Sequence, residues 1–213
     1  MRPSSPSAPR PAAAAAAAAS ATLLAALLAA AAPGGAFAAI PRPYPLFKQC
    51  DARWGNDTIE TTTICAVGCL MSSTAMALGG HGIGVAGAPA DPGTLNAWLR
   101  THGGYDSSND FNEGALPPLD PQHIGWSDAG GMHRTNDVAL PAVRALLGAG
   151  APVIANVDKG RHFVLVIGWS DADDDLLLVN DPGFDRGNYS YSNDVVGWRL
   201  FNMTNANRKF LRS

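Results

Sequence analysis

Apolar residues follow two different spacings along the chain, and the change falls near residue 150. Before that point they recur at helical intervals; after it they form short runs rich in β-branched residues, which are typical of strands. Helices are predicted from residue 69 or 70 to 78, from 91 to about 103, and over 137–148. Strands are predicted over 152–157, 162–167, 176–180 and 195–201. Because helices come first and consecutive antiparallel strands second, we expect an α+β fold in one domain.

Capping and turn residues mark the ends of these elements. Asp91 is suited to cap the second helix, with Pro92 at its first helical position, and Gly79-Gly80 stops the first helix. Residues 50–68 are rich in turn formers. Residues 104–135 hold one short apolar piece and are predicted to be irregular surface structure.

Residues 1–39 form a low-complexity leader that is mostly alanine. Two arginines precede an uncharged apolar stretch that ends in Ala36-Phe37-Ala38, which is the layout of a secretory signal peptide. We therefore expect residues 40–213 to be the mature domain, either secreted or kept in the secretory pathway. Two alternatives stay open: an organelle transit peptide, and an uncleaved anchor, since residues 12–32 are just long enough to span a bilayer.

The charge of the chain limits its partners. Its formal net charge is −3 and its basic residues are scattered, so nucleic acid is not expected to bind. No long apolar run follows residue 40, so no membrane contact is expected after removal of the leader, and we expect a monomer. Sequons that fit a glycosylated product begin at Asn56, Asn188 and Asn202.

Cys69 is the first candidate for chemistry. It follows Gly68 and precedes a run of small and apolar residues, so its sulfur should lie at a helix N-terminus, where unpaired N–H groups and the helix dipole favour a thiolate. The alternative is that Cys69 is a small buried hydrophobe, the commonest role of a free cysteine.

A thiolate nucleophile needs a base, a group that orients the base, and a stabiliser for the oxyanion. His162 heads an apolar strand and could supply the base, although it could also be a hydrogen-bonded core residue. Asn180 and Asp181 end the next strand, where neighbours face opposite sides, and we expect Asp181 to orient His162. The side-chain amide of Gln49 could stabilise the oxyanion together with the backbone N–H of Cys69, unless it is an ordinary surface residue.

In this order the residues resemble the C39-like peptidases, a papain-like family. In that family a Gln precedes a Cys-Gly-Pro-Thr-Ser-type helix start, and Met and Leu follow the Cys by seven and nine residues, as Met76 and Leu78 follow Cys69 here. The family's His-Phe-Val-Val-type strand matches residues 162–166, and its Asn-Asp-Pro matches residues 180–182. The resemblance covers about 45–201 and implies a papain-like α+β fold and a cysteine peptidase without cofactor.

The sequence departs from the family pattern in two respects. Leu70-Met71 replaces the usual Gly-Pro after the nucleophile, and no ATP-binding or membrane domain accompanies the chain, so the resemblance is to stand-alone members. If Cys69 stays free, Cys50 and Cys65 are the natural disulfide of the three cysteines, and they would hold Gln49 near the segment that leads to Cys69.

Metal sites fit the sequence poorly. Cys65 and Cys69 have a permissible zinc spacing, but no second ligand pair follows them. The acidic run 171–175 lacks the glycine and glutamate that a calcium loop requires, so we predict a solvated hairpin turn there.

The predicted function is hydrolysis of a peptide or other amide bond, in which Cys69 attacks, His162 moves the proton, Asp181 orients His162 and Gln49 supports the oxyanion. Two alternatives remain: a cell-wall amidase or acyltransferase that uses the same groups, and a catalytically silent extracellular binding module of the same fold.

Overall fold

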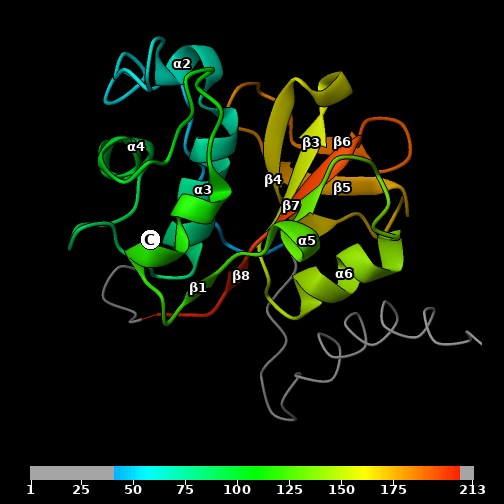
Figure 1. Ribbon diagram of the computed structural model, residues 1–213. Helices are drawn as coiled ribbons and strands as arrows, with labels where there is room; N and C mark the ends of the chain where they lie inside the picture. Colours follow the sequence, from blue (N-terminus) through cyan, green and yellow to red (C-terminus); the bar gives the residue numbers. More distant parts are fainter. Residues whose placement is uncertain (1–40, 207–213) are drawn as a thin grey trace, which may run out of the picture. The chain divides into compact units, whose positions relative to one another are not determined.

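Helix α3 (Cys69–Gly80) is the central helix of the computed structural model, which describes residues 41–206. Every residue from Leu70 to Leu78 is buried, so this helix has no solvent-facing stripe. Its sequence explains this, because the nine positions hold only apolar side chains and small hydroxyl groups. Helix α4 (Pro92–Thr101) lies on one side of α3 and the main sheet on the other (Figure 1). The predicted leader lies outside the described residues.

The other elements are short. The remaining helical segments are α2 (Ile64–Val67), η1 (Glu113–Ala115), η2 (Pro117–Leu119), α5 (Asp128–Gly131), α6 (Leu140–Gly148) and η3 (Asp158–Gly160). The strands are β1 (Ile124–Gly125), β2 (Met132–His133), β3 (Val153–Val157), β4 (His162–Trp169), β5 (Leu176–Asn180), β6 (Asn188–Ser190), β7 (Gly197–Leu200) and β8 (Asn202–Met203). None of the helices within residues 41–206 combines the length and apolarity that crossing a bilayer requires.

The predicted elements are present, with small changes at their ends. Asp91 caps α4, accepting a hydrogen bond from the Thr94 N–H at 2.8 Å while the Thr94 hydroxyl accepts one from the Asp91 N–H. Helix α6 begins at Leu140 rather than at residue 137, because Pro141 is favoured in a first helical turn. The acidic run 171–175 lies in the β4–β5 turn, as predicted.

Six strands form the main sheet in the order β2-β7-β3-β4-β5-β6, and every neighbouring pair is antiparallel. The β3–β4 hairpin pairs Val157 with His162, and the β4–β5 pairing sets Leu165 opposite Asn180. These registers place the start of β4 and the end of β5 at the same end of the sheet. Strands β1 and β8 form a separate two-stranded sheet.

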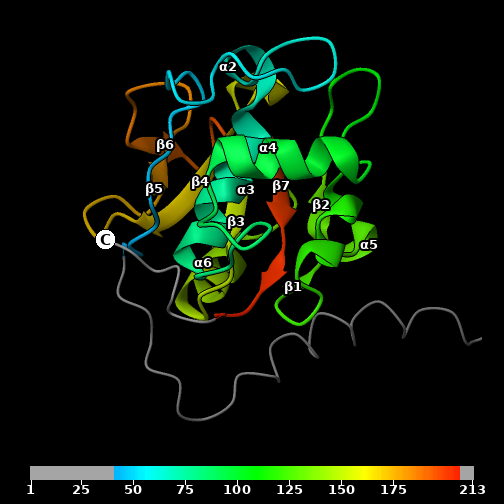
Figure 2. The same cartoon turned by 90° about the vertical axis from the view of Figure 1, so that its left-hand side faces the viewer.

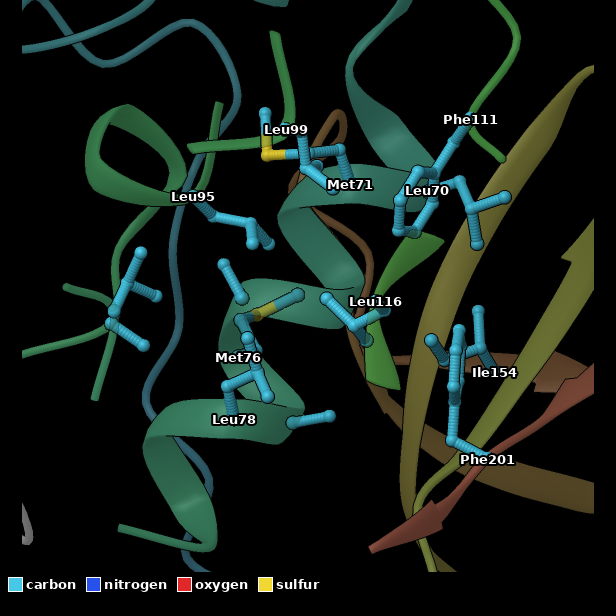
Figure 3. Close-up of a cluster of buried hydrophobic side chains, with 14 of the residues drawn as sticks. Leu70, Met71, Met76, Leu78, Leu95, Leu99, Phe111, Leu116, Ile154 and Phe201 are labelled. Carbon is cyan, nitrogen blue, oxygen red and sulfur yellow. The ribbon is translucent and has the colours of Figure 1, made fainter. Parts of the chain in front are cut away.

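Each face of the sheet covers its own core. Phe163 and Leu165 of β4 face the cluster around α3, whereas Val164 and Val166 face the cluster that includes Val143 and Leu147 of α6. Figure 3 shows the first cluster, with Leu95 and Leu99 of α4 on one side of α3 and Ile154 and Phe201 of the sheet half on the other. The sheet is therefore a middle layer between helices.

The prediction that residues 104–135 are surface structure is wrong in part. Phe111, Leu116 and Ile124 of this segment are buried in the cluster around α3. Glu113 is buried as well, and it accepts a hydrogen bond from the Nε of Arg199 on β7. A buried ion pair of this kind fixes the segment to the sheet, because either charge alone would be costly in the interior.

Removal of this carboxylate by Glu113→Ala is expected to lower the free energy of unfolding by about 3–5 kcal/mol, because Arg199 is left as an unpaired buried charge. The matched control is Asp174→Ala, which breaks the exposed Arg144–Asp174 ion pair and should change that free energy by less than about 1 kcal/mol. Urea denaturation followed by circular dichroism measures both. Equally small changes in the two variants would contradict the inferred importance of the buried pair.

Candidate active site

A cleft of about 560 Å³ lies where the α2–α3 junction meets the tip of the β3–β4 hairpin. Both features lie at the same end of the fold (Figures 1 and 2). Four of its lining residues are Gln49, Cys69, His162 and Gly183. The cleft thus brings together residues that lie more than one hundred positions apart in the sequence.

Cys69 is the first residue of α3 and is partly exposed, whereas the nine residues after it are buried. Gly68, which separates α2 from α3, is tightly enclosed: a Cβ there would lie 2.5 Å from the carbonyl oxygen of Ile64. The junction therefore requires a glycine immediately before Cys69. At this position the thiol lies at the N-terminus of a twelve-residue helix, next to N–H groups that have no partner within the helix.

His162, which lines the cleft, forms a buried pair with Asp181. The Nε2 of His162 lies 2.7 Å from Oδ1 of Asp181, and both side chains are almost completely covered. Asn180 points elsewhere and donates to the carbonyl oxygens of Tyr44 and Pro45. With Nε2 engaged by Asp181, Nδ1 is the ring nitrogen left for another partner. Cys69 lines the same cleft and lies close enough to His162 to favour the protonated ring.

The imidazole has an unusual proton affinity. Burial lowers the pKa of His162 because it penalises the charged ring, but hydrogen bonds and charge interactions with Asp181 and Cys69 outweigh this effect. The net result raises the pKa of His162 to about 9. The imidazolium is therefore the main form at neutral pH, which suits a ring that donates a proton to a leaving group.

Asp181 is held by more than its histidine. Its Oδ1 also accepts from the backbone N–H groups of Gly183 (2.8 Å) and Phe184 (2.9 Å), and its Oδ2 accepts from the Tyr189 hydroxyl (2.7 Å). Burial raises the pKa of Asp181, but these donors and His162 lower it below its ordinary value. The carboxylate therefore stays ionised beside His162.

Gln49 lies at the edge of the cleft, held by its backbone and by its side chain. Its N–H donates to the carbonyl oxygen of Pro182 at 2.9 Å, and its Nε2 donates to the carbonyl oxygen of Cys65 at 2.7 Å. The side chain is buried, and its Oε1 has no hydrogen-bond partner in the described part of the chain. Since an amide nitrogen carries two N–H groups, one remains for a bound group.

Sequence comparison adds an independent finding. The model of the Peptidase_C39 like family matches residues 42–204. The chain belongs to this family. No curated protein and no solved structure gave a significant match.

Membership of the C39-like family confirms the resemblance that was predicted over about 45–201, and the mixed arrangement of helices and antiparallel strands confirms the α+β papain-like fold. At the level of the family, the protein is of the cysteine peptidase type of hydrolase. The catalytic roles of individual residues stay predictions.

The cysteines of this C39-like chain are divided as predicted. Cys50 and Cys65 form the disulfide, and Cys69 is free. The disulfide encloses a loop with a sequence separation of 15, worth about 3 kcal/mol in the loop-entropy model. The disulfide holds Cys50, the neighbour of Gln49, to Cys65, and the side chain of Gln49 donates a hydrogen bond to the carbonyl oxygen of the same Cys65. Both interactions hold Gln49 against the segment that leads to Cys69.

The other candidate residues lie outside this arrangement. Asn56, Asn188 and Asn202 are all exposed, so each sequon is open to the solvent. In the part of the chain that the structure describes, no group of three or more His, Cys, Asp or Glu side chains is arranged to hold a metal ion.

The site contains one residue that sequence analysis missed. Tyr189 lies on the three-residue strand β6, in a stretch of sequence rich in Gly, Asn and Tyr. A strand this short shows no periodic pattern that would distinguish a buried tyrosine from an exposed one. Only the structure shows that Tyr189 is buried.

Gly183→Ala tests how closely the ring of His162 is packed. A Cβ at this position would lie 2.9 Å from Cε1 of His162 and 3.5 Å from its Nε2, so the ring must move from the position in which it bonds Asp181. We expect slower alkylation of Cys69 by iodoacetamide at neutral pH. The matched control is Gly187→Ala, where the new Cβ meets nothing within 4 Å and the alkylation rate should stay at its original value. An unchanged rate in Gly183→Ala would show that the ring is not confined.

The raised proton affinity of His162 predicts a pH dependence of stability. The pKa is about 9 in the folded protein and near 6.5 in an unconstrained histidine, so the folded state binds the extra proton between these values. The contribution to stability is therefore complete below pH 6.5 and is lost as the pH rises through about 9. Nuclear magnetic resonance titration of the ring should give the value near 9, and Asp181→Asn should lower it. A native value near 6.5 would refute the interaction.

Proposed function

We propose that the protein is a cysteine hydrolase that cleaves a peptide or other amide bond through a thioester intermediate. The observation that carries the proposal is the position of one imidazole: His162 bonds a buried carboxylate through Nε2 and lines the same cleft as the free Cys69 at the start of α3. Nucleophile, base and orienting group are the parts that covalent catalysis of this type requires.

In the first half of the proposed reaction, Nδ1 of His162 takes the proton of the Cys69 thiol. The sulfur then attacks the carbonyl carbon of the substrate, and the carbonyl oxygen becomes an oxyanion. The tetrahedral intermediate collapses as His162 gives its Nδ1 proton to the amine nitrogen, and the amine leaves. The acyl group remains on Cys69 as a thioester. Asp181 keeps the Nε2 proton in place throughout, so that only Nδ1 exchanges a proton with the reacting groups.

In the second half, the neutral His162 takes a proton from a water molecule, which attacks the thioester. Collapse of the second tetrahedral intermediate releases a carboxylic acid and restores the thiolate and the imidazolium. If an amine takes the place of water, the same steps give acyl transfer. That outcome and cell-wall amide cleavage therefore remain variants of the same proposal.

Gln49 is proposed to stabilise both oxyanions. Its amide nitrogen already donates one N–H to Cys65, and its second N–H and the backbone N–H of Cys69 could point to the same oxygen. The disulfide supports this role because it holds residue 50, the neighbour of Gln49, against Cys65.

The setting proposed for this reaction is the secretory pathway or the extracellular space. A disulfide suits an oxidising compartment, and three exposed sequons suit passage through one. Substrates there would be peptides or amide-bonded polymers.

Two reagents separate the proposed roles. Iodoacetamide should alkylate Cys69 below pH 7 faster than it alkylates the thiol of glutathione. With p-nitrophenyl acetate, the protein should release a burst of p-nitrophenol and carry an acetyl group on Cys69. Cys69→Ala should abolish both reactions, and His162→Ala should slow both. Gln49→Ala should keep the alkylation rate, since alkylation forms no oxyanion, but lower the rate of acetylation by roughly 10²–10³. Mass spectrometry of intact protein and peptides measures each product.

The alternative of a binding module gives the opposite results. A folded protein whose Cys69 reacts no faster than glutathione and takes no acetyl group is not a cysteine hydrolase. Equal loss of alkylation and acetylation in Gln49→Ala would remove the oxyanion role and leave the nucleophile in place. Addition of an amine during deacylation distinguishes hydrolysis from transfer by the product formed.

A further inference from the structure

The two oxygens of the Asp181 carboxylate have unequal partners. Oδ1 accepts three hydrogen bonds, from His162, Gly183 and Phe184. Within the described residues, Oδ2 accepts one, from the hydroxyl of Tyr189 at 2.7 Å. The side chain of Asp181 has no solvent exposure, so water does not replace a missing partner at its surface.

Tyr189 is placed to act as a fixed donor. It lies in the middle of β6, paired with Leu177 of β5, and is only 4% exposed. The guanidinium of Arg186 covers its ring at 3.8 Å from the centroid. Burial, and then the hydrogen bond and charge of Asp181, raise the pKa of Tyr189, so its hydroxyl keeps its proton throughout the useful pH range.

We propose that Tyr189 is a positioning residue for the proposed reaction, which holds Oδ2 of Asp181 so that Oδ1 stays directed at His162. The inference rests on the proposed function, because it assigns Tyr189 a role in that chemistry. Tyr189 itself touches no reacting atom. It acts through Asp181, and Asp181 acts through His162.

Loss of this hydroxyl has two physical consequences. The buried Oδ2 is left without a partner, and the carboxyl group gains freedom to rotate about its bond to Cβ, so the ring of His162 is held less well. The anionic form of Asp181 also loses a hydrogen bond, which moves the pKa of Asp181 upward. A protonated Asp181 no longer stabilises the imidazolium, so activity is lost at a higher pH on the acid side.

Other charged groups face this pair and set the background for the pH effect. They are His162 from β4, Lys48 from the N-terminal segment, and Arg186 and Asp194 from the segment that contains β6. The thiol of Cys69 from α3 lies beyond His162 in the cleft, and the exposed Asp185 pairs with Lys48. Lys48 donates to the backbone carbonyl of Asp181 and not to its carboxylate, and Arg186 is paired with Asp194. None of these pairings is altered by removal of the Tyr189 hydroxyl.

Tyr189→Phe tests the proposal in the full chain with p-nitrophenyl acetate. We expect the rate of Cys69 acetylation to fall roughly tenfold, as for loss of one buried hydrogen bond to a charged group, with KM unchanged. The acid limb of the pH profile should move to higher pH. The matched control is Tyr191→Phe, which loses one hydrogen bond to the Val138 carbonyl away from the cleft and should keep the original pH profile.

Two further measurements separate positioning from mere stability. In an Asp181→Asn background, Tyr189→Phe should cause no further loss of rate, since the residue it acts through has already been changed. If Tyr189→Phe does not fold, replacement of Tyr189 by 3-fluorotyrosine keeps the shape, strengthens the donor and should move the acid limb to lower pH.

The outcomes distinguish this proposal from the one on which it rests. If the unaltered protein forms no acetyl-enzyme, the proposed function fails. If the unaltered protein is acetylated but Tyr189→Phe keeps its acid limb, or loses as much rate with Asn at position 181 as with Asp, only the positioning role of Tyr189 is overturned.

Discussion

The candidate site depends on the complete burial of helix α3. A helix whose nine consecutive residues from Leu70 to Leu78 are all covered can neither slide nor rotate without breaking contact with both α4 and the sheet. Its first residue, Cys69, is therefore held in the lining of the cleft by the packing of the nine residues that follow it. The sheet half meets this helix through β4, the strand that begins with His162, so the same core that stabilises the fold sets the approach of the thiol and the imidazole.

Around this fixed thiol, the polar groups are arranged in a chain of contacts. Tyr189 bonds Asp181, Asp181 bonds His162, and His162 lines the cleft together with Cys69. Tyr189 lies on β6, Asp181 directly follows β5 and His162 begins β4, so the antiparallel pairing of these three strands holds the three residues close together. A buried polar chain of this kind is stable only when its members are satisfied, which explains why Asp181 accepts four hydrogen bonds.

The sequence predicted those parts of the molecule that carry a repeated or local signal. The helix after Gly68, the Asp91-Pro92 helix start and the β-branched strands were found because their patterns extend over many residues or fall on capping positions. Strands of two residues, such as Ile124–Gly125, hold too few positions to show a period. Glu113 was missed for a different reason: a charged residue is expected at the surface, and its partner Arg199 lies 86 positions away.

The three cysteines, which lie within twenty residues of each other, require opposite oxidation states. Cys50 and Cys65 form a disulfide beside Gln49, whereas Cys69 is free and would have to remain reduced for the proposed role as nucleophile. A reducing agent strong enough to restore an oxidised Cys69 could also open the neighbouring disulfide, and a strongly oxidising medium would protect the disulfide at the expense of the thiol. The redox potential of the surroundings must therefore lie within a limited range, low enough to keep Cys69 reduced and high enough to keep the disulfide closed. The thiol added to the buffer should be chosen with both requirements in mind.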